Sequence, residues 1–386
     1  MTNFKVLFDY NAFTYQKYGG VSNSFCQLIS HFPSFVNYEI AIKESNNYHL
    51  MDSNLLENIK AARLDLDNFV THNNFKGKYN LYHLLSEYLP LFPSIDRVNK
   101  HYSIDRIKSG DFDILHPTGF STYFLKHLHG KPFVYTIHDM TTQLFSSSSG
   151  MKRQSNYVSI ISKRANHIVA VSQNTKNDII RILGIPESKI TVVHHGAPSR
   201  NEKADFSYDQ YFLYVGARHS YKYFIPFLEG FKLFCKKNNS VKLVCTGEPF
   251  NEEELFVIEK LQLQNNIIHT FVSKEQLDNL YSKAIAFVYP SLYEGFGMPI
   301  LEAYSNGCPA VLNNKSCFPE VAGDVAIYFD SNNGAEDISN ALNKIYNFSN
   351  TKRMQLISDG YERMKLFSWE ESSKKLAQVY YNVLNK

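Results

Sequence analysis

Short apolar runs alternate along this chain with stretches in which apolar residues recur at helical spacing. In the first half, the apolar runs predict buried strands at residues 6–8, 39–42, 114–116, 133–137, 168–171 and 190–193. Between these strands, apolar residues recur at helical spacing, as at residues 157–165 and 175–183. Short apolar strands separated by helices are typical of a parallel sheet that helices cover on both faces.

The same alternation restarts in the second half. Its apolar runs predict strands at residues 212–215, 241–245, 267–271, 286–289, 309–312 and 326–329. Helices are predicted at residues 224–236, 252–261, 274–283, 299–306 and 336–346. Residues 369–384 predict a last helix whose apolar side carries Leu376, Val379, Tyr380 and Val383.

Two stretches interrupt the alternation. Residues 196–209 are polar, contain Pro198 and lack an apolar period, so we interpret them as a linker between two α/β domains. Two such domains imply a cleft, because ligands of these sheets bind beyond the carboxyl ends of the strands. Residues 45–110 are harder to assign: helix-like pieces at 55–62 and 79–88 precede an apolar loop at 89–93, which either caps the core or contacts a hydrophobic substrate.

Length and charge narrow the class of protein. The 386 residues suit two domains at roughly 150 residues per domain. A net charge of +3 argues against a general nucleic-acid binder. Residues 1–195 nevertheless hold 20 Lys and Arg against 15 Asp and Glu, and 12 of the 14 histidines. This basic half either faces an anionic partner, such as a membrane surface or a lipid-linked phosphate, or carries its charge as surface scatter.

Cysteine usage and hydropathy predict the compartment. The five cysteines form no CxxC pair, which favours buried thiols in a reducing compartment over a disulfide framework or a zinc site. We find neither a signal peptide nor an apolar stretch approaching the roughly 20 residues of a membrane span. We therefore expect a cytoplasmic protein that is at most peripheral to a membrane.

The strongest motif follows the predicted strand at 286–289 and enters a predicted helix. It reads Pro290-Ser-Leu-Tyr-Glu294-Gly-Phe-Gly-Met-Pro-Ile-Leu-Glu302. Its glycines let backbone N–H groups approach a ligand, and a helix N-terminus is a ready anion site. Glu294 and Glu302 can accept hydrogen bonds from vicinal hydroxyls of a sugar or ribose. The alternative is an ordinary strand–turn–helix junction with two surface glutamates.

Two further strand–helix junctions carry candidate phosphate ligands. In Tyr214-Val-Gly-Ala-Arg218-His-Ser-Tyr-Lys222, Arg218 offers a planar fork and Lys222 a point charge for one diphosphate. The alternative is a solvated basic loop. Gly19-Gly20 after the first strand is a weaker signal, because it is shorter than GxGxxG and lacks a P-loop lysine.

Histidines end several predicted strands. His138 closes an apolar strand, where it either binds a sugar hydroxyl or pairs structurally with Asp139. His116 ends a second strand, and His194 and His195 end the last strand before the linker.

Acidic pairs with D-x-D spacing do not predict a metal site here. Asp65-Leu-Asp67 and Asp111-Phe-Asp113 have that spacing but precede no suitable strand–loop junction. We therefore expect chemistry that needs no divalent ion.

At these residues the sequence resembles the GT-B glycosyltransferases of the large retaining family that includes many bacterial mannosyltransferases. The resemblance covers nearly the whole chain, and the Glu-x7-Glu with its Gly-Phe-Gly-Met-Pro interior is its most specific part. Its pieces are Gly19-Gly20-Val-Ser, Asp113-Ile-Leu-His-Pro-Thr118, Thr136-Ile-His-Asp139, Ile168-Val-Ala-Val-Ser172, Tyr214-Val-Gly216 with Lys222, Glu294 to Glu302, and Phe318-Pro-Glu-Val-Ala-Gly323.

The resemblance implies an α/β fold with two Rossmann-like domains facing across a cleft. Residues 1–198 would form the acceptor-side domain and residues 199–368 the donor domain, with the helix at 369–386 crossing back to the first. Arg218 and Lys222 would hold the donor diphosphate, and Gly20 would approach it from the first domain.

The same likeness assigns the remaining donor contacts. Glu302 would bind the nucleotide ribose, Glu294 would reach hydroxyls of the transferred sugar, and His138 would sit at that sugar. Backbone contacts to the sugar and phosphates would come from Phe296, Gly297, Met298 and Pro299, with Gly216 in the donor-binding turn. Ala217 stands where many relatives have Arg or Thr, which favours Lys222 over Arg218 as the diphosphate ligand.

The expected reaction is a retaining hexosyl transfer without a cofactor or metal. The donor would be GDP-mannose or a UDP-sugar, with mannosyl transfer as the first candidate. The acceptor would be a glycan or lipid-linked saccharide of a surface polysaccharide, reached at the cytoplasmic face of the inner membrane. The alternatives are a nucleotide-sugar epimerase of the same architecture and a non-catalytic carbohydrate-binding scaffold.

Overall fold

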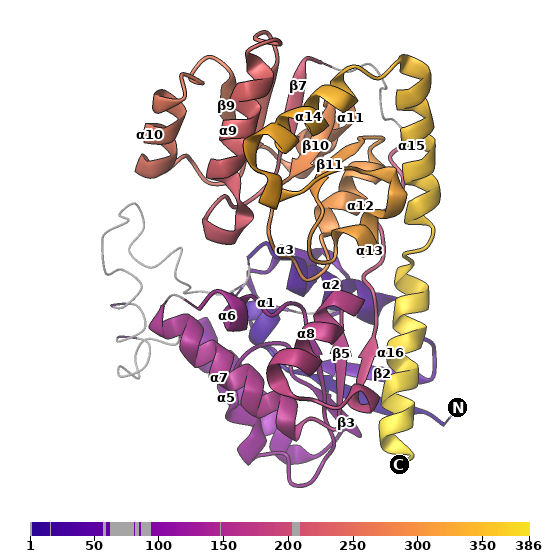
Figure 1. The fold of residues 1–386 in the computed structure, drawn as a ribbon. Coiled ribbons are helices and arrows are strands. Elements are labelled where there is room, and N and C mark those ends of the chain that lie inside the picture. The colour runs from indigo at the N-terminus through magenta and orange to yellow at the C-terminus, as the bar shows by residue number, and fades with distance from the viewer. Residues whose placement is uncertain are drawn as a thin grey trace.

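The computed structural model of the protein consists of two stacked α/β domains (Figure 1). It describes residues 2–15, 17–56, 59–61, 81, 85, 94–146, 148–202 and 209–386. The loop predicted at 89–93, most of the helix predicted at 79–88, the Asp65–Asp67 pair and part of the predicted linker lie outside these residues. The helix predicted at 55–62 is wrong over its described part, where Lys60 forms a β-bridge with Glu44.

The first domain is built on parallel strands, as the apolar runs predict. Two three-stranded sheets, ordered β2-β1-β3 and β4-β5-β6, are joined by a parallel bridge between Leu115 and Phe133. Every residue of β4 is buried, as expected for a strand covered on both faces. The strands are β1 Phe4–Phe8, β2 Val36–Ile40, β3 Ile114–His116, β4 Val134–Ile137, β5 His167–Ala170 and β6 Ile190–Val192.

The helices of this domain cover its sheets. They are α1 Asn11–Tyr15, α2 Gly20–Ser30, α3 Tyr48–Asp52, α5 Ile95–Ser109, α6 Thr141–Leu144, α7 Ser149–Arg164 and α8 Gln173–Leu183, with 3₁₀ turns η1 Tyr123–Lys126 and η2 Glu187–Lys189. Helix α5 was not predicted, because its buried side carries Asn99 and Ser103 between Ile95 and Ile107. The Asn99 side chain binds the backbone N–H of Lys43 (3.0 Å), so a polar residue supplies part of this helix's docking.

The second domain has one parallel sheet in the order β12-β11-β10-β7-β8-β9. Chain order reverses between β7 and β10, which is the topological switch point where ligands of such sheets bind. The strands are β7 Tyr211–Tyr214, β8 Lys242–Thr246, β9 Ile267–Thr270, β10 Ala286–Tyr289, β11 Ala310–Asn313 and β12 Ile327–Phe329. The helices are α9 Phe224–Cys235, α10 Glu252–Lys260, α11 Lys274–Lys283, α12 Met298–Ser305, α13 Phe318–Ala322, α14 Gly334–Tyr346 and α15 Asn350–Met364, with turns η3 Ser220–Lys222, η4 Gly323–Val325 and η5 Ser331–Asn333.

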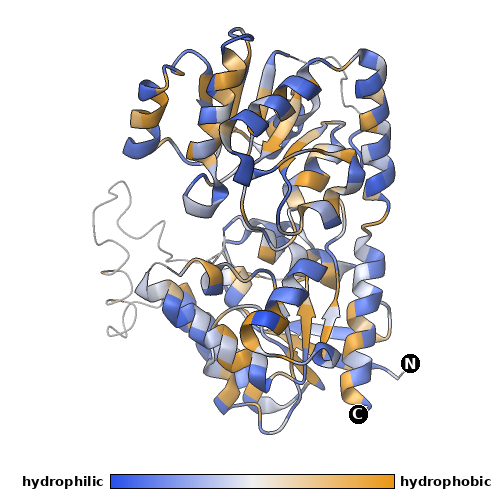
Figure 2. Cartoon of the chain, viewed as in Figure 1, coloured by the Kyte–Doolittle hydropathy of each residue, from blue (hydrophilic) through white to orange (hydrophobic). Residues whose placement is uncertain are grey.

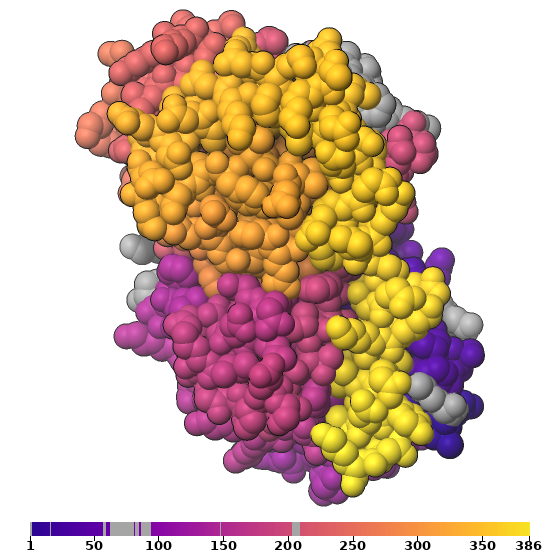
Figure 3. Space-filling model, turned by 45° about the vertical axis from the view of Figure 1, so that its right-hand side comes forward, coloured from indigo at the N-terminus to yellow at the C-terminus, as the bar shows by residue number. Residues whose placement is uncertain are grey.

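The last helix, α16 (Trp369–Leu384), returns to the first domain, as the resemblance implies. Its Leu376, Ala377 and Tyr380 belong to the same apolar core as Phe8 and Phe25. Figure 3 shows this segment in yellow, running down the side of the first domain. Figure 2 shows the apolar strands between helices with hydrophilic outer faces.

Two chain segments cross between the domains and contact each other. The backbone N–H of Ala197 donates to the carbonyl of Phe367 (2.9 Å). A methyl group at Gly196 would lie 2.4 Å from Trp369, so only glycine allows this approach.

All five cysteines are buried and free. Among the described residues, no helix combines the length and the hydropathy that crossing a membrane requires.

Candidate functional site at the domain boundary

Lys222 and Glu294 meet at the switch point of the second sheet. Lys222 ends η3 after β7, and Glu294 lies in the loop after β10, the neighbouring strand. Lys222 Nζ is 2.7 Å from Glu294 Oε1, and the two side chains are 15% and 14% exposed. Burial is the largest single influence on the pKa of Lys222 and lowers it, but the charge and hydrogen bond of Glu294, with Tyr221 and Asp139, together raise it by more, so the pKa lies above its usual value. A lysine that is charged and only partly hydrated therefore faces the boundary.

Ser316 fixes the backbone of Glu294. Its hydroxyl accepts from the Glu294 N–H (3.1 Å) and donates to the Glu294 carbonyl (2.7 Å). The N–H of Leu292 donates to the carbonyl of Tyr221 (2.8 Å), which joins the two site loops directly. No pattern in the sequence pointed to Ser316, which lies 22 residues after Glu294.

His138 brings the first domain to this loop. A methyl group at Gly295 would lie 1.7 Å from the carbonyl oxygen of His138, so the domains touch where Gly295 has no side chain. The His138 Nε2 atom is buried and finds no hydrogen-bond partner among the described residues. Asp139 instead accepts from the backbone N–H of Thr141 (2.7 Å). Because a buried polar atom without a partner is costly, this nitrogen is suited to a ligand hydroxyl.

The protonation of His138 follows from its surroundings. Burial lowers its pKa to about 4, against the smaller opposing effect of Asp139. The ring is therefore neutral near pH 7, with one nitrogen that donates and one that accepts.

Two of the other strand-end histidines, His116 and His194, form hydrogen bonds within the protein. The ring nitrogens of His116 contact the Tyr380 hydroxyl (2.5 Å) and Thr136 Oγ1 (2.8 Å). His116 thus ties the first sheet to α16. His194 contacts the carboxylate of Glu320 in the second domain (2.8 Å).

Arg218 is buried within the second domain. Its Nε lies 3.1 Å from Glu254 Oε1, and Nη2 donates to the carbonyl of Pro249 (2.9 Å). The guanidinium also stacks on Phe250, 4.7 Å from its ring centre. Its side chain is only 3% exposed. In this structure Arg218 therefore orders the loop after β8, whereas Lys222 pairs with Glu294.

Replacing Arg218 by alanine is expected to lower the stability of the ligand-free protein. The change leaves the Glu254 carboxylate buried without its cation, which typically costs about 3–5 kcal/mol. The matched control is Arg181→Ala, whose ion pair with Asp178 has a 63% exposed arginine and should change stability by less than about 1 kcal/mol. Thermal unfolding of both variants measures the loss of stability. If Arg218→Ala and Arg181→Ala had equal melting temperatures, Arg218 would have no structural role.

Two uncapped helix N-termini lie in the predicted donor-binding segments. Helix α12 begins after Gly297, whose φ of 85° favours glycine. Helix α2 begins at Gly20, and no described atom lies within 4 Å of a methyl group placed there. Neither helix has a side-chain cap among the described residues. The N–H groups of Gly20, Val21 and Met298 find no partner among the described residues and remain available to an anion.

The remaining predicted site residues surround these helices. Phe296 packs on His195 (5.0 Å between ring centres), and Met298 contacts the apolar cores of both domains. Pro299 follows in the first turn of α12. Gly216 has a φ of 102°, which favours glycine in the turn after β7.

Glu302 lies on α12, half-buried against α11. Burial raises the pKa of its carboxyl, and one oxygen lies 3.5 Å from the Tyr281 hydroxyl. No contact in the described residues joins Glu302 to Lys222 or Glu294. The structure thus brings Lys222, Glu294 and His138 together around Gly295, whereas Glu302 lies farther along the chain on α12.

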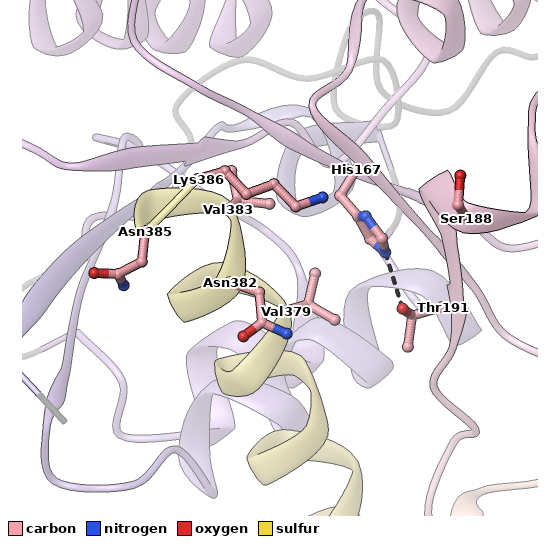
Figure 4. Close-up of a pocket in the computed structure, with 8 residues that line it drawn as sticks. All are labelled: His167, Ser188, Thr191, Val379, Asn382, Val383, Asn385 and Lys386. Atoms are coloured by element: carbon pink, nitrogen blue, oxygen red, sulfur yellow. Dashed lines mark hydrogen bonds between the residues drawn. The ribbon is translucent and has the colours of Figure 1, made fainter.

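A separate cavity lies at the other end of the first domain. It has a volume of about 470 Å³ and is lined by His167, Ser188, Thr191, Val379, Asn382, Val383, Asn385 and Lys386 (Figure 4). His167 begins β5, so this cavity sits at the amino end of the strand, away from the switch-point loops. Within the described part of the chain, no group of three or more His, Cys, Asp or Glu is arranged to hold a metal ion.

Comparison with known families places both halves of the chain in one class. The family model "Glycosyl transferases group 1" matches residues 198–363, and the model "Glycosyltransferase Family 4" matches residues 68–199. Among curated proteins, the chain is 28% identical over 241 residues to O-antigen chain mannosyltransferase RfbU of Salmonella typhimurium, covering 57% of this chain and 67% of that protein.

A second curated relative is also a glycosyltransferase, and one solved structure has a similar fold. The chain is 27% identical over 244 residues to GDP-mannose:cellobiosyl-diphosphopolyprenol alpha-mannosyltransferase of Xanthomonas oryzae pv. oryzae, covering 61% of this chain and 62% of that protein. The match therefore spans about two thirds or less of each relative's length. The fold is similar to HepE of Anabaena in complex with UDP and glucose, at a TM-score of 0.69, 13% identity, and coverage of 98% and 99% of the two chains.

Proposed function

Because the chain belongs to the GT-B glycosyltransferases of the family 4 type, we propose that it transfers a hexosyl group, with retention, from a nucleoside-diphosphate sugar. The acceptor is a hydroxyl of a glycan or lipid-linked saccharide in surface polysaccharide synthesis. The observation that carries the proposal is the ion pair of Lys222 and Glu294 at the switch point, beside the unpaired Nε2 of His138.

The proposed donor site uses groups from both domains. Lys222 and the N-termini of α12 and α2 face the diphosphate, and Glu302 binds the ribose. Glu294 accepts from sugar hydroxyls, and His138 exchanges a hydrogen bond with one of them. Backbone groups of residues 296–299 complete the contacts to the sugar and phosphates. Arg218 acts indirectly, since its guanidinium holds the loop after β8.

The proposed chemistry rests on electrostatic stabilisation. As the bond from the anomeric carbon to the phosphate oxygen breaks, its electron pair remains on the diphosphate. Lys222 and the free N–H groups stabilise that charge in a site shielded from water. The acceptor oxygen bonds the anomeric carbon on the same face, and its proton passes to the departing phosphate oxygen. Domain closure excludes water, which limits hydrolysis of the donor.

Mannose is the sugar that we propose first. The two curated relatives are a mannosyltransferase of the O-antigen chain and one that uses GDP-mannose with a diphosphopolyprenol-linked acceptor. A UDP-sugar is the second candidate. We also propose that the reaction needs no divalent ion, since Lys222 and two helix N-termini supply positive charge, and that the protein works at the cytoplasmic face of a membrane.

Nucleotide binding is expected to stabilise the protein. At a concentration of 100 Kd, a ligand that binds only the folded state stabilises it by about 2.7 kcal/mol. A panel of GDP, UDP, ADP and their sugars in thermal unfolding, each without added metal and with Mg²⁺, measures the rise in melting temperature. We expect GDP and GDP-mannose to give the largest rise.

A transfer assay with the best donor then separates the reaction classes. Release of nucleoside diphosphate that depends on a saccharide acceptor supports the proposal. A changed sugar nucleotide without released diphosphate would instead identify an epimerase. Stabilisation by saccharides alone would identify a carbohydrate-binding scaffold, and the proposal would then be abandoned.

A further inference from the structure

The amino end of α8, in the first domain, contacts a carboxylate of the second domain. Glu320, in α13, accepts from the backbone N–H groups of Gln173 (2.7 Å) and Asn174 (3.1 Å). Its Oε1 also lies 2.8 Å from His194 Nε2. One carboxylate from the second domain thus receives two of the free N–H groups that begin a helix of the first.

The same helix end contacts the loop of Glu294. Ser172, the N-cap of α8, donates from its hydroxyl to the carbonyl of Gly295 (2.6 Å). Thr175 donates to that carbonyl as well (3.2 Å). Asn174 donates to the hydroxyl of Ser316 (3.3 Å), which in turn holds the backbone of Glu294. Three side chains at the start of α8 therefore bond to Gly295, the residue beside Glu294, and to Ser316, which holds the Glu294 backbone.

We propose that Glu320 is a positioning residue for the transfer reaction, because its contact with the start of α8 makes closure of the domains and placement of Glu294 one event. This inference rests on the proposed function, since it assumes that Glu294 binds the transferred sugar. Glu320 itself touches no reacting atom. It acts through α8, Asn174 and Ser316.

The energetics favour a charged contact. An anion at a helix N-terminus is stabilised by the helix dipole and by free N–H groups, most strongly where water is partly excluded. Burial raises the pKa of Glu320, but its bonds with His194, Gln173 and Asn174 lower it by more, so the pKa lies below its usual value. The carboxylate is therefore ionised at neutral pH. Opening the domains removes all three bonds together, which makes the closed arrangement cooperative.

A role in positioning and a role in stability alone predict different measurements. If Glu320 only stabilises the fold, its loss lowers the melting temperature while the folded fraction keeps normal turnover. If Glu320 couples domain closure to the placement of Glu294, its loss lowers kcat of the fully folded protein. The affinity for free nucleotide stays nearly unchanged, because the second domain provides most of that binding.

The test uses Glu320→Ala and Glu320→Gln, with Glu362→Gln as the matched control. Glu362 lies in the same domain, is exposed, and pairs only with Lys365 among the described residues. We expect Glu320→Ala to lower kcat by about 10²-fold, as small misplacements of a reacting group do, with the Kd for GDP or UDP changed less than about threefold. Glu320→Gln keeps the volume and one acceptor oxygen, so it should fall between the alanine variant and wild type.

Domain closure is measured independently of catalysis. Cysteines introduced at the exposed positions Lys152 on α7 and Glu259 on α10 can carry a pair of distance probes, since the five native cysteines are buried. We expect one short-distance population in wild type and in Glu362→Gln, and a broader, longer distribution in both Glu320 variants.

Each outcome decides the proposal. Unchanged distances in the Glu320 variants, or altered distances with normal kcat, would overturn it. Should the alanine variant unfold at the assay temperature, the glutamine variant is read by the same criteria. If wild type transfers no sugar at all, the proposed function fails, but the distance distributions still show whether Glu320 holds the domains closed.

Discussion

Replacing Lys222 by alanine is expected to lower the rate of glycosyl transfer by about 10²–10³-fold, the usual cost of removing one group that stabilises developing charge. Lys222 is 2.7 Å from Glu294 and little exposed, so water replaces its charge poorly. The loss should fall mainly on kcat, because charge on the diphosphate grows as the glycosidic bond breaks. Steady-state kinetics with saturating acceptor and varied donor measure it.

The Glu294→Ala variant should lose activity to a similar degree, since both residues form one unit. Lys365→Ala is the matched control: its lysine pairs with Glu362 on the surface, and we expect normal kinetics. If Lys222→Ala and Glu294→Ala both keep near-normal turnover on the true substrates, our assignment of the site is wrong.

Replacing Gly295 by alanine is the second change with a large expected effect. The new methyl group would lie 1.7 Å from the carbonyl oxygen of His138 and 3.0 Å from Cβ of Asp139. Backbone cannot yield by that amount, so the domains must separate or the Glu294 loop must move. We expect kcat to fall by about 10²-fold through misplacement of Glu294, and stability to fall by about 1–3 kcal/mol as in overpacked cores.

Gly150→Ala is the control for this change. Gly150 lies in the first turn of α7, and the nearest atom to an added methyl group is 3.8 Å away. Alanine there should be neutral or stabilising by up to about 1 kcal/mol. Kinetics and thermal unfolding of both variants give the comparison. A Gly295→Ala protein with normal kcat would show that the contact with His138 is not needed for turnover.

The strands of both domains could be predicted from apolar runs alone, because buried parallel strands have no polar face. Thus 114–116 and 286–289 match β3 and β10 to the residue. Strand β2 begins three residues before its prediction, since Asn37 is exposed and interrupts the run. Helices α5 and α15 were not predicted, because polar residues such as Asn99 and Arg353 occupy their buried sides.

The candidate site could be predicted only in part. Glu294 and Lys222 stand out because each follows a strand and precedes a helix. The two residues are 72 positions apart, and their direct pairing depends on β7 lying beside β10. Arg218 and Lys222 lie in the same loop after β7, and the sequence does not indicate which of them is buried within the second domain. The reason is that the partner of Arg218 is Glu254, 36 residues later. The contact of Glu320 with α8 spans 147 residues and two domains.

The return of α16 to the first domain has a consequence for synthesis. Residues 376–380 complete the apolar core around Phe8 and Phe25, and Tyr380 binds His116. Domains generally fold as units while the chain emerges from the ribosome, the N-terminal one first. Here the second domain, with its sheet within residues 211–329, has all its strands before α16 exists. The first domain, although it is synthesised first, should therefore complete its core last. Its apolar core stays partly exposed until α16 leaves the exit tunnel.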